Sequence, residues 1–140
     1  MIKPLRWFAL VLFTLLPALA SAQQQGLEID IIGGNASALP ITVVPMPYQG
    51  TAAAPATDVA AVVRADLERS GAFRTLPVAS ITERPTRGGE IQYPTWRALR
   101  QDYLVVGRVA DAGDGSYRVE YELFDVAKQE RLLGFALTAP

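Results

Sequence analysis

The sequence predicts an α/β fold of the α+β kind, in which two helices pack on a mixed sheet of about five or six strands. Apolar and polar residues alternate with period two in several segments, which is typical of half-buried strands. Residues 58–70 instead repeat at the helical period. Residues 102–139 contain three strand-like segments joined by the short turns "AGDGS" and "VAKQE", and this arrangement indicates a β-meander.

The first strand-like segment is "LEIDIIGGN", residues 27–35. Its apolar residues Leu27, Ile29 and Ile31 alternate with acidic ones, and "GGNASA" then ends the pattern. A strand close to a free chain end is either tied into its own sheet or available to the sheet of another protein. With "QQQG" ahead of it as a tether, this segment is suited to joining a partner's sheet by β-augmentation.

The next two elements are a strand and a helix. Residues 39–45, "LPITVVP", are a short β-branched run between prolines and predict a strand, whereas residues 46–57 predict a loop. The segment "DVAAVVRADLERS" predicts a helix with Thr57 or Asp58 as its N-cap and Gly71 as its C-terminal stop. Its apolar stripe consists of four residues at helical spacing: Val59, Val62, Val63 and Leu67.

The second half of the chain predicts one more helix and the meander. Residues 72–81 predict a short strand and a turn, and residues 82–94 a polar surface loop that contains proline and glycine. The helix "PTWRALRQ" has Pro94 near its first turn. In the meander, the continuous apolar run "YLVVG" suits a central strand covered on both faces, whereas "YRVEYELFDV" alternates between apolar and charged residues.

Residue types that are missing from the sequence restrict its chemistry. The chain contains no histidine and no cysteine, which excludes Ser-His-Asp and Cys-His nucleophiles and an ordinary zinc site. Carboxylates remain: Glu120 and Glu122 share one face of a predicted strand. Arg118 on the same face favours an exposed charged stripe over a general acid and base. We therefore expect no catalytic residue, no cofactor and no metal.

Three other motifs have a structural interpretation that is simpler than a functional one. The segment "IIGGNAS", residues 31–37, precedes no helix N-terminus and lacks a lysine, so it predicts a turn rather than a phosphate loop. The segment "DAGDG", residues 111–115, lacks the ligand pattern of a calcium loop and predicts an Asp-Gly hairpin turn. Trp96 lies at helical spacing from Leu99, which favours a core position over a ligand-stacking one.

The first residues have the pattern of a cleaved secretion signal. Lys3 and Arg6 precede the apolar run "WFALVLFTLL", and "ALASA" supplies the small residues that a signal peptidase requires. We expect residues 1–22 to be removed by cleavage between Ala22 and Gln23. The mature chain then carries 11 basic and 14 acidic residues, a net charge near −3 that argues against nucleic-acid binding. No direct membrane insertion is expected after cleavage.

Several of these segments, taken in order, resemble one known family. They are "LEIDIIGGNASALPITVVPM", "DVAAVVRADLERSGAFRTLP", "YPTWRALRQDYLVVGRV" and "GDGSYRVEYELFDV". Together they resemble the N-terminal domain of the TolB family, the periplasmic component of the Tol-Pal system. The resemblance implies that the stretch after signal cleavage contacts TolA, and that a C-terminal β-propeller, absent from this chain, binds Pal.

The resemblance also suggests which residues contact the partner. The TolA-contacting stretch falls on twelve consecutive residues: Gly26, Leu27, Glu28, Ile29, Asp30, Ile31, Ile32, Gly33, Gly34, Asn35, Ala36 and Ser37. Residues 23–38 are then a strand and tether, and residues 39–140 are the remainder of a domain that we expect to continue beyond Pro140.

The resemblance thus implies a non-catalytic periplasmic interaction domain that supports outer-membrane integrity and constriction at cell division. Two alternatives stay open. One is a structural domain that only packs on a missing propeller. The other is a carboxylate-based periplasmic hydrolase, which requires Glu120 or Glu122 to lie in a cleft.

Overall fold

The computed structural model of the protein describes residues 37–140, so the predicted signal peptide and the first predicted strand lie outside the described residues. No helix between residues 37 and 140 is both long and apolar enough to cross a membrane. Two 3₁₀ turns, Val78–Ser80 and Gly88–Glu90, precede the second helix. The main elements are β1 (Leu39–Val43), β2 (Tyr48–Gln49), α2 (Val59–Arg69), β3 (Phe73–Thr75), α3 (Tyr93–Ala98), β4 (Tyr103–Gly113), β5 (Ser116–Asp125) and β6 (Glu130–Ala139).

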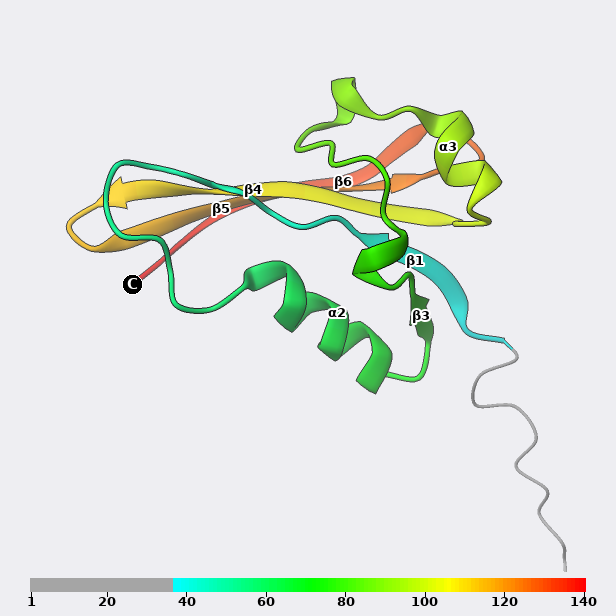
Figure 1. Cartoon of the computed structure of the whole chain (residues 1–140), viewed down its shortest axis with the longest axis horizontal. Coiled ribbons are helices and arrows are strands. Elements are labelled where there is room, and N and C mark those ends of the chain that lie inside the picture. Colours follow the sequence, from blue (N-terminus) through cyan, green and yellow to red (C-terminus); the bar gives the residue numbers. More distant parts are fainter. Residues whose placement is uncertain (1–36) are drawn as a thin grey trace, which may run out of the picture. The chain divides into compact units, whose positions relative to one another are not determined.

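The strands form one mixed sheet in the order β3-β1-β4-β5-β6, with β2 paired to β4 (Figure 1). β1 is parallel to both neighbours, and Ile41 stands opposite Thr75 on one side and Tyr103 on the other. Parallel strands need a crossover connection, which α2 supplies between β1 and β3. β4, β5 and β6 are antiparallel and form the predicted meander. The predicted mixed sheet with two helices is confirmed.

Helix α2 begins and ends where the sequence predicts. The Asp58 carboxylate accepts a hydrogen bond of 3.1 Å from a backbone amide of the first turn, so Asp58 and not Thr57 is the N-cap. Gly71 follows the helix with a φ of +71°, a conformation that glycine adopts without a Cβ clash. Val62, which the sequence places on the apolar stripe, is instead 46% exposed, because the sheet covers this helix from one side only.

Hydrophobic side chains pack on both faces of the sheet, and β4 contributes to both layers. Leu104 and Val106 belong to a buried cluster that includes Trp96 of α3, whereas Val105 belongs to a second cluster that includes Ala60 of α2. Successive residues of a strand point to opposite faces, so one strand serves both clusters. Figure 1 accordingly shows α2 and α3 on opposite sides of the sheet. The prediction of a central strand covered on both faces is confirmed.

The prediction of a loop over residues 46–57 is wrong in one place, because the short strand β2 lies within it and pairs in parallel with β4. The Tyr48 ring packs edge-on against Tyr117 with 6.1 Å between the ring centroids. The Pro47 carbonyl accepts a hydrogen bond of 3.0 Å from the Val109 amide. Both contacts join segments far apart in the chain, so local propensity does not reveal them.

The second helix is shorter than the predicted segment 94–101, because α3 ends at Ala98. Arg100 has a φ of +56°, which lies outside the right-handed helical region. The Gln101 side chain then accepts a buried hydrogen bond of 3.0 Å from the Thr42 hydroxyl. This contact fixes the end of the helix to β1.

Candidate functional site

Only the last residue of the predicted TolA-contacting stretch lies within the described residues. Ser37 is exposed and lies two positions before the first residue of β1. Residues 26–36 lie outside the described range, as do the cleavage position between Ala22 and Gln23 and most of the "IIGGNAS" segment. Docking of that stretch on its own sheet and its pairing with a partner's sheet therefore both stay predictions.

The "DAGDG" segment forms the turn between β4 and β5. The Asp111 carboxylate accepts a hydrogen bond of 2.8 Å from the Gly113 amide. Gly113, Asp114 and Gly115 all have a positive φ, the conformation that tight hairpins require and that glycine and aspartate tolerate. The prediction of a hairpin turn is confirmed.

Trp96 is fully buried, so the prediction of a core position is confirmed. It packs in the cluster on the α3 side of the sheet with Leu104, Val106 and Phe124. A side chain without exposed surface has no face on which a ligand could stack.

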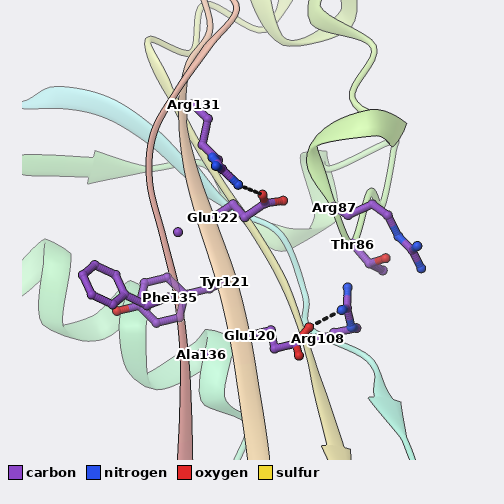
Figure 2. A pocket seen from close by; sticks show the side chains of 10 residues that line it. Thr86, Arg87, Arg108, Glu120, Tyr121, Glu122, Arg131, Phe135 and Ala136 are labelled. Carbon is purple, nitrogen blue, oxygen red and sulfur yellow. Dashed lines mark hydrogen bonds and ion pairs between the residues drawn. The ribbon is translucent and has the colours of Figure 1, made fainter.

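Glu120 and Glu122 of β5, which lie on the face of the sheet opposite to α2, line a hollow of about 470 Å³ whose lining also includes Tyr121 and Phe135. Figure 2 shows Arg131 of β6 directed at Glu122, and Arg108 of β4 directed at Glu120. The Arg131–Glu122 ion pair has an N–O distance of 3.0 Å, and Glu120 pairs with Arg108 and, at 2.9 Å, with Arg118. The two glutamate side chains are 28% and 26% exposed.

These contacts determine what the carboxylates can do. The hydrogen bond from the Arg118 guanidinium, together with the charge of Arg108, holds the pKa of Glu120 below its usual value. A general acid of a glycosidase needs the opposite shift, because it must be protonated near neutral pH. Glu122 accepts a hydrogen bond of 2.9 Å from the Gly88 amide besides its ion pair with Arg131. The arrangement therefore links β4, β5, β6 and the loop before α3.

The opposite face of the same strands forms an apolar groove, which the sequence patterns above do not predict. The groove has a volume of about 660 Å³, and no charged side chain is among the residues that line it. One wall is formed by α2, and the floor by β4, β5 and β6. Residues that represent its wall and floor are Val59, Val63, Leu67, Tyr121, Leu133 and Leu137.

Strand β6 borders this groove and is exposed along nearly its whole length. Its exposed large hydrophobic residues are Leu132 (45%), Leu133 (36%), Phe135 (61%) and Leu137 (45%). Within residues 37–140, its outer edge pairs with no other strand. The alternation of "LGFAL" in the sequence is the signal that could have identified this surface.

Comparisons with known proteins agree on one family. The TolB amino-terminal domain family matches residues 27–132 of this chain. The Tol-Pal system protein TolB of Xanthomonas campestris pv. campestris is 72% identical over 137 residues, and that of Xanthomonas oryzae pv. oryzae is 69% identical. These alignments cover 98% of this chain and 31% of each relative, so the chain spans about a third of the length of the curated relatives it matches.

Solved structures show the same fold. The crystal structure of TolB from Acinetobacter baumannii has a TM-score of 0.56 and 31% sequence identity, and the alignment covers 74% of this chain and 23% of that one. The C-terminal domain of LpoB from Salmonella enterica has a TM-score of 0.59, with 77% of this chain and 86% of that one covered. At 13% identity, the second similarity concerns the fold alone.

Proposed function

Because this chain belongs to the TolB family through the match of its residues 27–132 to the amino-terminal domain, we propose that it is a non-catalytic interaction domain of the Tol-Pal system. The family match is the observation that carries the proposal. The relatives at 69% to 72% identity are named as Tol-Pal system proteins, which supports the same role. In this role the domain acts in the periplasm, after removal of residues 1–22, and contributes to outer-membrane integrity and constriction at division.

A carboxylate-based hydrolase receives less support. Glu120 does lie in a hollow, but its ion pairs with Arg108 and Arg118 lower its pKa and favour the ionised form, whereas a general acid must be protonated. A role as an interaction domain requires no general acid.

The proposed partner is TolA, and the proposed contact is residues 26–37. In this mode, Leu27, Ile29 and Ile31 enter pockets on the partner while the main chain adds a strand to its sheet. The acidic residues between them then lie on the opposite side of the added strand. The hydrophobic alternation gives specificity, and the main-chain hydrogen bonds give most of the affinity.

The test is an NMR titration of residues 23–140 with the periplasmic C-terminal domain of TolA. We expect shifts and broadening at the amides of residues 27–32. The double variant Ile29→Asp with Ile31→Asp should weaken binding by at least about tenfold, because it places two charges against apolar pockets. Unfolding by urea should be unchanged.

The control is Val62→Asp, which places one such charge on an apolar residue that is 46% exposed on α2. We expect this variant to bind TolA like the unchanged chain. Normal binding by the Ile29 and Ile31 double variant would contradict the strand-addition mode, and an absence of any TolA-induced shift would contradict TolA binding by this domain.

A further inference from the structure

The hollow beside β5 is lined by more positive than negative side chains. Three arginines border it, Arg87 from the loop before α3, Arg108 from β4 and Arg131 from β6. Against them stand the two glutamates Glu120 and Glu122, so three positive and two negative charges leave a surplus of one positive charge. The chain as a whole has a formal net charge of −1. A positive hollow in a slightly acidic protein concentrates anions at that place.

Arg87 and Arg108 each use only one guanidinium nitrogen to contact a carboxylate. The Nε atom of Arg87 lies 3.1 Å from an oxygen of Glu90, and the Nη2 atom of Arg108 donates a hydrogen bond to Glu120. A guanidinium has five N–H donors, so most donors of both groups have no acceptor within residues 37–140. The two arginine side chains are 59% and 28% exposed, which leaves these donors accessible to a ligand.

Both arginines act on the same place in the hollow, although they come from distant parts of the chain. The hydrogen bond from Arg118 is the largest cause of the lowered pKa of Glu120, and the charges of Arg108, Arg118 and Arg87 add to it. Figure 2 shows Thr86, Arg87 and Arg108 on one side of β5, with Glu120 beside Arg108. The fold thus brings arginines from a loop, from β4 and from β5 around a single carboxylate.

From these observations we propose that this part of the hollow binds a small molecule with a carboxylate or phosphate group, to which Arg87 and Arg108 donate hydrogen bonds. The guanidinium fork matches the geometry of both oxyanions. The small residues Gly134 and Ala136 of β6 line the hollow, and its volume of about 470 Å³ has room for further atoms of a ligand. Glu120 competes with the ligand for Arg108, which keeps the affinity low.

An NMR titration of residues 23–140 with inorganic phosphate tests the proposal, with sodium chloride adjusted to hold the ionic strength constant. We expect saturable shifts of the backbone amides of residues 86–88 and of the Nε–H signals of Arg87 and Arg108. The dissociation constant should lie in the millimolar range, because the site is open to water and shared with a carboxylate. A parallel titration with acetate distinguishes a preference for phosphate from a preference for carboxylate.

Two substitutions should change the affinity for phosphate in opposite directions. Arg87→Gln should raise the dissociation constant at least about fivefold, because it removes a charged donor. Glu120→Gln should lower it at least about threefold, because the ligand then meets no carboxylate that competes for Arg108. The matched control is Arg69→Gln, which removes an exposed arginine that pairs with Asp66 on α2 and should leave the constant unchanged. Far-UV circular dichroism checks that each variant is folded.

Three results would overturn the proposal. The first is the absence of any saturable shift with phosphate and with acetate beyond the shift that sodium chloride alone produces. The second is binding that Arg69→Gln weakens as much as Arg87→Gln does, because the anion would then follow the net charge of the protein and not this site. The third is weaker binding by Glu120→Gln, because Glu120 would then support the ligand and not compete with it.

Discussion

The two faces of the β5–β6 pair differ in whether their side chains find partners within the described residues. On the face directed away from α2, the carboxylates of Glu120 and Glu122 pair with arginines from β4, β5 and β6. On the α2 face, Tyr121 and its apolar neighbours line a groove that remains open, and Phe135 is 61% exposed. Alternation along one strand thus creates a face whose glutamates are paired within residues 37–140 and an apolar face that is partly uncovered within the same residues.

This difference separates stability from interaction. Exposed ion pairs contribute little to stability. The pairs do neutralise the carboxylates of Glu120 and Glu122, so these two side chains need no partner protein to balance their charge. An apolar groove and an exposed hydrophobic edge gain free energy only when something covers them. The glutamate pairs of the charged face are therefore expected to be structural, and the apolar face to be the one whose covering lowers the free energy.

The largest expected effect comes from comparing the same leucine-to-alanine substitution at two positions that differ in burial, Leu104 and Leu133. Leu104→Ala removes a fully buried side chain from the cluster beside α3 and should cost about 2–5 kcal/mol. Leu133→Ala removes the same atoms from a side chain that is 36% exposed at the groove and should cost less than about 1 kcal/mol. Urea unfolding at low protein concentration measures both. Equal losses would show that the groove face is as well packed as the α3 face.

A substitution of intermediate effect concerns Gly107, at the centre of the sheet on the groove face. A Cβ at this position would lie 2.5 Å from the Glu120 carbonyl oxygen and 3.1 Å from the Tyr121 Cβ. Because the first of these atoms is backbone, the strands must shift, and Gly107→Ala should destabilise the domain by about 1–3 kcal/mol. Gly89→Ala is the control, since a Cβ there meets no atom within 4 Å. A neutral Gly107→Ala would mean that β4 and β5 can separate freely at this point.

Much of the fold follows from local patterns in the sequence. The Asp58 cap, the Gly71 stop, the doubly covered run in β4 and the Asp-Gly turn after it are all local signals, and each is confirmed. These features depend on residues within a few positions of each other, so a single sequence is sufficient to identify them.

The features that the sequence did not reveal depend on distant contacts. β2 pairs with β4 and its Tyr48 contacts Tyr117, and the arginines around Glu120 come from β4 as well as from its own strand. The sequence places Arg118 beside the carboxylates, but it cannot show that Arg108 reaches the same group. The groove likewise requires α2 to cover only part of one sheet face, which no periodicity specifies.

The smallest effect concerns the charged face and its dependence on pH. The pKa of Glu120 lies below its ordinary value of 4.5 in the folded domain, mainly because the Arg118 guanidinium donates a hydrogen bond to it. A lowered folded pKa contributes stability above the unfolded pKa, and this contribution is lost as the pH falls through the folded value. Glu120→Gln should therefore be less stable than the unchanged domain at pH 7 and lose less stability between pH 7 and acid.

Thermal unfolding across this pH range measures the change, and Arg118→Gln should reduce the acid dependence in the same direction because it removes the donor. Asp125 provides the internal control: the Lys128 amide lowers its pKa independently of the arginines. Its carboxyl titration, followed by NMR, should be the same in both variants, so part of the acid dependence remains. If Glu120→Gln showed the same acid dependence as the unchanged domain, the arginines around Glu120 would not favour its charged form. The pairing of charges that distinguishes this face from the apolar groove would then contribute nothing to the stability of the domain.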